Sequence, residues 1–537
     1  MTAAIERSLG GYRGLPVREE PGRVVIGPST CPVCFELRRS LDHRPPVAPT
    51  ALACDTVAAL VADEIEALER TTDAVLFVDL ASLRVTRHRF LPEPLCPRCG
   101  NLPDDGPEVL SLRSRPKRAP DNYRVGTLPD VLDTYFDAET GMIRVLERAT
   151  LGGLAVTNAV LPTRDGDIEV GCGQTRDYRS SERTAVLEAL ERWGGFQPGG
   201  KRTSVRSSYR ELAGQALDPR QLGTHAPEDY LRPGFRYRPF DADEVLPWVW
   251  GYSFGRAEPI LVPESVAYYR TGGRLVYECS NGCALGGCLE EAILHGILEV
   301  AERDAFLYSW YTRTPPFRVD LDSARDRSVP VQAAAIELAT GYRLSVYDTT
   351  TETGVPCAWA MAVSPSDAFD IPKVVCAGGA HLDLERAVLN ALGEVGHVTA
   401  VLRATFPALA AKARLMIDDP DLVVELEDHT TLYGAHEAFD RFSFLDSSPV
   451  RAFGSPVPGA ADLRDDLLFL VDRYLSRGMD VIVVDQTTPE HRISGLSCVK
   501  VIIPGTVPIT FGHANRRLHG LPRLAGFSLN PNPHPFP

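Results

Sequence analysis

Two Cys-x-x-Cys pairs stand out in this 537-residue chain because their spacing suits metal binding. Cys31 and Cys34 form the first pair, and Cys96 and Cys99 form the second. Thiolates in such pairs are preferred ligands of tetrahedral Zn²⁺, and four of them leave no open position for water. One pair alone could be a redox dithiol, and four unrelated reduced thiols are the remaining alternative. Two pairs flanking one module favour a structural zinc site.

A second pattern, Leu-Glu-x-x-Glu-Arg, occurs twice, at residues 187–192 and 298–303. Each copy lies in a stretch of helical periodicity, where residues three or four apart share one face. On the helix that contains the second copy, Glu291, Glu299 and Glu302 fall within an arc of about 80°. The flanking residues are so apolar that this helix should be mostly buried, and buried carboxylates are costly without cations. We therefore expect a positive group beside them.

Carboxylates that converge from several helices offer the hard oxygen ligands that Mg²⁺ takes when it is bound to a nucleoside triphosphate. Glu394 lies in a third helical pattern and could join such a cluster. The alternative is that the glutamates lie on solvated faces and pair with Arg192 and Arg303. The repetition of the pattern, its apolar surroundings and the loop around Ser280 and Asn281 favour a nucleotide site.

The elements that must position these residues alternate between strands and helices. Apolar strand-like runs at 153–162, 258–269, 343–350, 356–363, 480–488 and 499–505 are interspersed with helical patterns at 181–193, 289–311, 328–340, 383–404 and 461–477. This order predicts a mixed α/β (α+β) fold. We expect a small αβ zinc module at residues 1–110, with a helix near 55–70, then an exposed linker at 111–130 and a catalytic domain at 131–537.

Composition excludes several classes of protein. Hydrophobic residues make up 44% of the chain and charged residues 24%, as in ordinary globular proteins. The net charge of −15 works against binding to nucleic acid or to anionic membranes. No apolar stretch is long enough to predict a membrane span or a signal peptide. We therefore expect a cytoplasmic protein with reduced thiols.

At these residues the sequence resembles the YcaO superfamily, whose members use ATP to phosphorylate a peptide amide oxygen. Residues 171–193, 280–306 and 380–397 resemble the ATP-binding segments of that family, and 495–512 resembles its last strand pair. The final PHPFP matches the Pro-x-Pro-x-Pro tail of azoline-forming members. The resemblance covers about residues 130–537 and implies a YcaO-type ATP-binding domain.

The resemblance also implies roles for individual residues. It places around ATP and its Mg²⁺ ions Thr184, Glu188, Glu191, Arg192, Ser280, Asn281, Glu291, Glu299, Glu302, Arg303 and Glu394. Of these, Glu191, Glu299 and Glu302 are the expected Mg²⁺ ligands. The chain departs from the usual pattern in having Thr184 for Ser, Cys172 for Lys, Asn390 for Arg and His397 for Gln. These departures concern phosphate contacts more than metal ligands.

Residues 78–100 resemble the zinc-tetrathiolate part of the ThiF-like domain that accompanies such enzymes. The N-terminal module is too short for the whole domain, so the resemblance implies a separate ThiF-like partner that binds the leader peptide. It further implies a ribosomal precursor peptide as substrate and a homodimer. A downstream flavin dehydrogenase that oxidises the product is a further partner compatible with the family.

The resemblance predicts an ATP-dependent cyclodehydratase that converts Cys, and/or Ser and Thr, into azolines. The tail residues Pro533, Pro535 and Pro537 are then expected to reach into the active site; an exposed, disordered tail is the alternative. Two other functions stay open. One is a YcaO-type thioamide synthetase, and the other is a non-catalytic scaffold that presents peptide to a partner.

Overall fold

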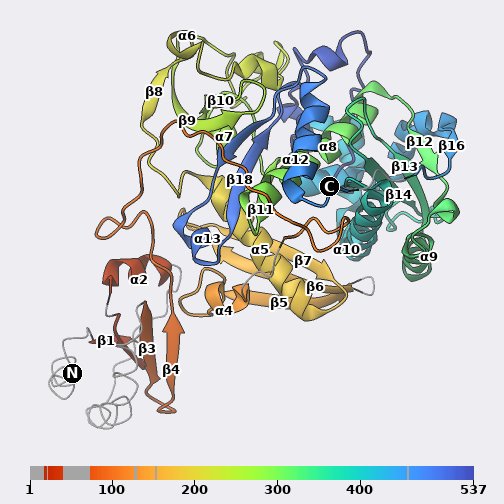
Figure 1. Ribbon diagram of the computed structural model, residues 1–537. Helices are drawn as coiled ribbons and strands as arrows, with labels where there is room; N and C mark the ends of the chain where they lie inside the picture. Colours follow the sequence, from red (N-terminus) through yellow and green to blue (C-terminus); the bar gives the residue numbers. More distant parts are fainter. Residues whose placement is uncertain are drawn as a thin grey trace.

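The computed structural model describes residues 17–39 except 21 and 29, then 73–125, 130–151, 154–455 and 459–537. The helix expected near residues 55–70 lies outside these ranges. In the described ranges, four sheets and their covering helices make up the mixed α/β structure in Figure 1. Within the described residues, no helix combines the length and the apolar character needed to cross a membrane.

The N-terminal sheet is antiparallel, with the strand order β1-β2-β3-β4. Its elements are β1 (Val17–Glu20), β2 (Arg23–Ile26), α2 (Pro32–Arg39), β3 (Ala74–Asp79) and β4 (Val85–Arg89). Phe35 of α2 and Phe77 of β3 are buried between helix and sheet together with Phe90. This small core is separate from those of the larger sheets, and both Cys-x-x-Cys pairs lie at its edge.

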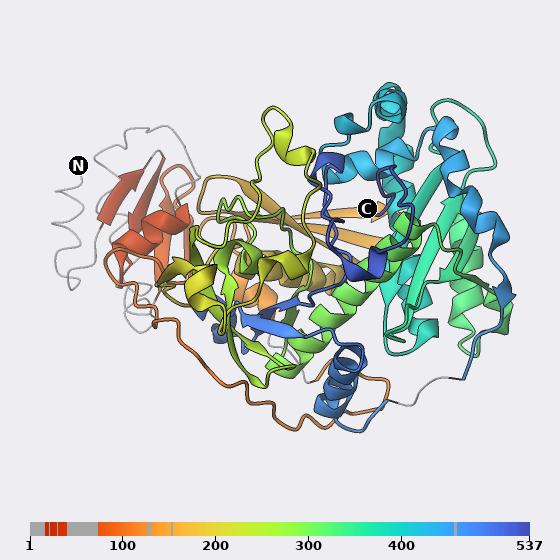
Figure 2. The same ribbon diagram turned by 90° about the horizontal axis from the view of Figure 1, so that it is seen from above.

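An extended segment connects this module to the rest of the chain and runs along the outside of the molecule (Figure 2). It is mostly exposed, as expected for a linker, but it is bound at several points. The backbone N–H of Lys117 donates to the carbonyl of Ala461, and Arg124 pairs with Glu291 at 2.8 Å. The boundaries of the three parts at residues 110 and 130 stay predictions.

A three-stranded antiparallel sheet follows, in the order β5-β6-β7, and α5 packs on β7 and β6. Its elements are α4 (Val131–Tyr135), β5 (Val145–Leu151), β6 (Leu154–Pro162), β7 (Ile168–Thr175) and α5 (Tyr178–Phe196). A Cβ at Gly173 would lie 1.8 Å from the carbonyl oxygen of Ser181, so only glycine permits this close approach of strand and helix. The sheet therefore fixes the position of α5.

A central sheet has the order β10-β9-β17-β18-β11, with β8 beside β9. Its strands are β8 (Val205–Ser208), β9 (Val245–Ser253), β10 (Glu258–Pro263), β11 (Cys283–Gly286), β17 (Ile482–Asp485) and β18 (Ser497–Ile502). The helices around it are α6 (Tyr209–Leu212), α7 (Glu264–Ala267), α8 (Leu289–Thr312), α12 (Leu463–Leu475) and α13 (Pro489–Ile493). Helix α8 packs on β11 and β18, so this sheet fixes the second glutamate-bearing helix.

The fourth sheet has the order β15-β14-β13-β12-β16, and α10 packs on β15 and β14. Its strands are β12 (Phe317–Val319), β13 (Arg343–Asp348), β14 (Cys357–Val363), β15 (Val374–Ala380) and β16 (Val450–Arg451). Its helices are α9 (Ser328–Thr340), α10 (Leu384–Asp418) and α11 (Leu426–Leu432). The described 3₁₀ helices are η1 (Pro219–Leu222), η2 (Asp229–Leu231), η3 (Leu321–Ser323), η4 (Pro420–Leu422), η5 (His436–Ser447), η6 (His513–Asn515) and η7 (Pro522–Leu524).

The mixed α/β class expected from the sequence is confirmed, but two elements differ in extent. Helix α10 continues to Asp418 through Pro407, although a proline inside a helix costs about 3 kcal/mol. Phe406, Ala410 and Ala413 continue its buried face, so packing outweighs the proline. The strand-like run from 258 ends at Pro263 and continues as the short helix α7.

Candidate active site and metal centre

Seven of the residues expected to surround ATP form an acidic cluster at the meeting point of three helices. Helix α5 supplies Glu188, Glu191 and Arg192, α8 supplies Glu299, Glu302 and Arg303, and α10 supplies Glu394. The charge of each glutamate acts on those of neighbouring helices, as between Glu191 and Glu299 and between Glu302 and Glu394. Because each helix is fixed by a different sheet, the cluster forms only when the whole domain is folded.

Salt bridges within the helices and to strand β7 orient part of the cluster. Arg192 donates to Glu188 at 2.7 Å and to Glu169 at 2.8 Å, and Arg303 lies 2.7 Å from Glu299. The side chains of Arg192 and Glu299 keep 35% and 23% of their surface exposed. The cluster therefore lies deep in the protein and still reaches solvent. Five carboxylates face only two guanidinium groups within it.

This excess of carboxylates changes their acidity. Burial, together with the charges of Glu299 and Glu188, raises the pKa of Glu191 to about 8. Burial and the charge of Glu394 raise the pKa of Glu302 to about 8, and burial raises that of Glu394 to about 7. Glu191 and Glu302 consequently hold protons at neutral pH unless cations replace them.

The expected Mg²⁺ ligands are not gathered tightly enough to enclose an ion by themselves. Among the described residues, the four cysteines are the one group of three or more ligand atoms that lie within 4.8 Å of one another. Mg²⁺ is usually held by one or two carboxylates together with water and substrate phosphates. The acidic cluster suits that kind of shared coordination.

The C-terminal tail is buried beside this cluster. Tyr433 donates to the carbonyl of Pro533 at 2.5 Å, and Phe536, which is 2% exposed, packs against Phe306. A Cβ at Gly378 in β15 would lie 2.7 Å from the ring of Phe536 and 2.9 Å from Cγ of Glu302. The last residues of the chain thus contact the same glycine as an expected metal ligand. The described tail is ordered by packing and is not a free extension.

A scan against family models matches residues 172–507 to the family described as YcaO cyclodehydratase, ATP- and Mg²⁺-binding. The chain belongs to the YcaO family. The matched range includes every member of the acidic cluster. It contains neither the cysteines of the N-terminal module nor the tail beyond residue 507. What these two regions do must therefore be argued from their own contacts.

Relatives of this YcaO protein share modest identity with it. A protein of Methanothermobacter thermautotrophicus, described as uncharacterized, is 27% identical over 68% of this chain and 89% of its own length. A protein of Rhizobium leguminosarum bv. trifolii, described as an uncharacterized protein in the tfuA 3′ region, is 26% identical over 62% of this chain and 76% of its own length.

Two solved structures share the fold over 99% of this chain at 22% identity. One is described as a heterocyclase in complex with substrate and cofactor; its TM-score is 0.75 and 79% of it is covered. The other is the heterocyclase TruD, with a TM-score of 0.68 and 77% coverage. The YcaO-type fold expected from the sequence is confirmed by these comparisons.

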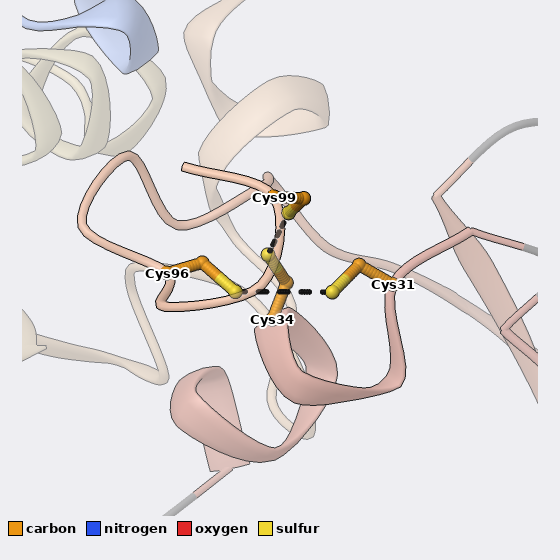
Figure 3. A group of neighbouring side chains, drawn as sticks. All are labelled: Cys31, Cys34, Cys96 and Cys99. Carbon is orange, nitrogen blue, oxygen red and sulfur yellow. Dashed lines mark hydrogen bonds between the residues drawn. The ribbon is translucent and has the colours of Figure 1, made fainter. Parts of the chain in front are cut away.

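The four cysteines of this YcaO protein meet at the edge of the N-terminal sheet (Figure 3). Cys31 and Cys34 lie at the start of α2, and Cys96 and Cys99 lie in the turn after β4. The Sγ atoms of Cys31 and Cys96 are 3.8 Å apart, and those of Cys34 and Cys99 are 3.2 Å apart. Zn–S bonds of about 2.3 Å require edges of about 3.8 Å in a tetrahedron. The arrangement, which we call the four-cysteine site, fits a tetrathiolate ion.

Three other sequence-expected site residues lie differently. Thr184 is exposed and donates to the carbonyl of Ser180 in its own helix at 3.0 Å. Glu291 accepts from Arg124 at 2.8 Å and from the backbone of Val125 at 2.9 Å, so its described partners belong to the extended segment. Ser280 closes a turn by accepting the N–H of Cys283 at 2.7 Å.

Asn281 borders a small cavity that also contains residues the sequence analysis did not single out. Lys500 and Arg517 are buried there and both pair with Glu278, at 3.1 Å and 2.7 Å. The charge of Lys500 also acts on Glu299. A lone lysine inside the apolar strand SCVKVI is a recognisable signal, because a fully buried lysine almost always has an anionic partner.

Proposed function

We propose that this YcaO protein forms azolines in a ribosomally made peptide. Family membership supports an ATP-dependent cyclodehydratase-type enzyme. The observation that carries the finer proposal is the tail, because its buried residues end beside Glu302 in the acidic cluster. The Pro-x-Pro-x-Pro pattern of this tail is also the feature by which the sequence resembles azoline-forming members of the family.

In the proposed reaction a Cys, Ser or Thr side chain attacks the preceding amide carbonyl, the amide oxygen takes the γ-phosphoryl group of ATP, and phosphate leaves. The chain's residues have the roles that phosphoryl transfer needs, which are positioning and charge neutralisation. Glu191, Glu299 and Glu302 would hold Mg²⁺, and the guanidinium groups of Arg192 and Arg303 would face phosphate. The raised pKa values of Glu191 and Glu302 indicate that the cluster lacks positive charge, which Mg²⁺ would supply on displacing the protons.

We assign the remaining expected residues to the edges of this site. Thr184, Ser280, Asn281 and Glu394 would border the nucleotide, and Glu291 would fix the extended segment that lies over the start of α8. Pro533, Pro535 and Pro537 would form the wall against which the peptide is held. The four cysteines would hold a Zn²⁺ ion that stabilises the small module.

We further propose that the protein acts with a leader-peptide-binding partner of the ThiF-like type. The N-terminal module with its four-cysteine site is the part of the chain that resembles that partner domain. A homodimer and a flavin dehydrogenase that acts on the product are both compatible with the proposed reaction. Neither is required for the cyclodehydration step itself.

Removal of residues 533–537 tests the proposal. The truncated protein should bind Mg·ATP and lose ring formation, measured by mass spectrometry as loss of one water mass per ring from a Cys-containing precursor peptide supplied with its partner. A Phe536→Leu variant keeps an apolar contact with Phe306 and serves as the control. Rings formed at an unchanged rate by the truncated protein would exclude a catalytic tail. Sulfur incorporation from added sulfide would point to a thioamide synthetase.

A further inference from the structure

The four-cysteine site is joined to the acidic cluster by a continuous set of buried contacts. Glu93 lies three residues before Cys96, and its backbone N–H donates to Sγ of Cys34 at 3.4 Å. Its carboxylate pairs with Arg38 at 3.2 Å and with Arg164 at 2.9 Å. Arg38 is one turn beyond Cys34 on α2, and Arg164 belongs to the turn between β6 and β7. One carboxylate thus links the cysteines to both parts of the chain.

Glu490 of α13 continues this set of contacts. It is fully buried, accepts from Arg38 at 2.9 Å and lies 3.6 Å from Arg164. Two carboxylates and two guanidinium groups therefore form a balanced buried network. Arg164 also lies 4.1 Å above the ring of Trp193 in α5, which adds a cation–π contact. Buried pairs of this kind require defined geometry to offset their desolvation.

The next residue, His491, completes the connection to α5. Its Nδ1 accepts the backbone N–H of Thr488 at 3.0 Å, so its Nε2 carries the proton and donates to the carbonyl of Leu190 at 2.9 Å. Leu190 directly precedes Glu191, an expected Mg²⁺ ligand, and Trp193 follows two residues later. The network therefore contacts α5 on both sides of Glu191.

We infer that the four-cysteine site is a positioning element for the nucleotide site: metal binding by the cysteines fixes Glu93, and the Glu93–Arg38–Arg164–Glu490 network holds α5 where Glu191 can bind Mg·ATP. This inference rests on the proposed function. Such coupling between two sites is reciprocal, so Mg·ATP must also stabilise the metal in the cysteine site. Glu93 and Glu490 are positioning residues, since neither touches nucleotide.

The experiment uses the full chain and measures the coupling in both directions, from zinc to Mg·ATP and from Mg·ATP to zinc. Mg·ATP is titrated calorimetrically into zinc-loaded and chelator-treated protein, and zinc loss to a colorimetric chelator is followed with and without Mg·ATP. We expect zinc removal to weaken Mg·ATP binding by about five-fold or more, and Mg·ATP to slow zinc loss by a similar factor. In Glu490→Gln, which touches no cysteine, both factors should fall to about one.

The matched control is Glu437→Gln, which removes an exposed ion pair with Arg414 outside this network. A purely structural effect of Glu490→Gln would change zinc loss equally with and without Mg·ATP, whereas loss of coupling changes the ratio. Glu93→Gln is a second, isosteric variant. Equal Mg·ATP affinity with and without zinc would overturn the inference and leave the proposed function intact. Absence of Mg·ATP binding to the loaded wild type would overturn the proposed function and this inference with it.

Discussion

The acidic cluster and the four-cysteine site collect similar numbers of anionic ligand groups by different means. The cysteines come from the start of α2 and from the turn after β4, both in one small module, and their sulfurs lie within 4.8 Å of one another. The glutamates come from α5, α8 and α10, which three different sheets hold in place. The four-cysteine site is therefore formed within one small module. The acidic cluster depends on the packing of the larger domain and is open enough that phosphate oxygens must share the coordination.

The largest effect should follow from removing two of the expected Mg²⁺ ligands together. In a Glu191→Ala, Glu302→Ala variant we expect Mg·ATP binding to fall below detection in calorimetry, because only Glu299 remains of the three expected Mg²⁺ ligands. Glu437→Ala is the control, since its carboxylate is exposed. Retained binding in the double variant would mean that the cluster is not the nucleotide site.

A Cys31→Ser, Cys96→Ser variant tests the four-cysteine site. Small metal-bound modules gain much of their folding free energy from the ion. We expect zinc content to fall from about one to none per chain in elemental analysis, and residues 30–39 and 73–100 to become sensitive to protease. The half-buried Cys172→Ser variant is the control, as Cys172 lies outside the group of four. Full zinc content in the double variant would exclude the tetrathiolate assignment.

The sequence predicts the four-cysteine site better than it predicts the acidic cluster. Spacing alone identifies Cys31, Cys34, Cys96 and Cys99, because the geometry of each pair is contained in one turn. Periodicity places Glu299 and Glu302 on a buried helix, but it also groups Glu291 with them, and the structure gives that residue partners from the extended segment. Helical periodicity predicts which residues share one face of a helix. It does not predict which other segments of the chain pack against each turn of that helix.

Sequence reasoning misses the basic residues that lie near the acidic cluster. Lys500 lies on β18 and Arg517 near the C-terminus, more than two hundred residues after Glu278, with which both pair. Nothing in local periodicity links such positions. The bounds of α8 and α9 are predictable to within a few residues because their apolar residues recur at helical spacing, whereas the end of α10 is not predicted.

The raised pKa values of the acidic cluster make the stability of the protein depend on pH. The folded protein holds protons on Glu191 and Glu302 up to pH of about 8, whereas the unfolded chain releases them near their ordinary pKa of 4.5. The folded state therefore binds more protons between these values, and the stability of the nucleotide-free protein falls as pH rises through that window. We expect a lower melting temperature at pH 9 than at pH 6.

Two measurements sharpen this expectation. Glu302→Gln should reduce the difference in melting temperature between pH 6 and pH 9, because the glutamine has no proton to lose. Saturating Mg·ATP should also reduce it, since Mg²⁺ replaces the protons. Calorimetry in buffers of different ionisation enthalpy should show proton release on binding at pH 7. An unchanged melting temperature across this range would contradict the raised pKa values.

The smallest effect concerns the tail, whose pH dependence has the opposite sign. His429 donates through Nδ1 to the carbonyl of His534 at 2.8 Å, while its Nε2 accepts the N–H of Gly512 at 3.0 Å. The contact with Gly512 requires a neutral ring, because a protonated Nε2 cannot accept, and burial lowers the pKa of His429 to about 4. The unfolded chain takes up this proton first, near pH 6.5, so the contacts lose stability as pH falls from about 6.5 to about 4.

We therefore expect amide exchange in residues 530–537 to accelerate at pH 5 relative to pH 7.5, after correction for the intrinsic rates, while exchange in α8 stays slow. A His429→Gln variant can donate and accept like the neutral imidazole and has no proton to gain, so its tail should lose this pH dependence. His534 is stacked on His429 at 4.0 Å and is also buried and neutral, which leaves a residual effect in the variant. An equal acid response in both proteins would mean that the tail is held by the packing of Phe536 alone. The pH dependence of the site would then come from the acidic cluster.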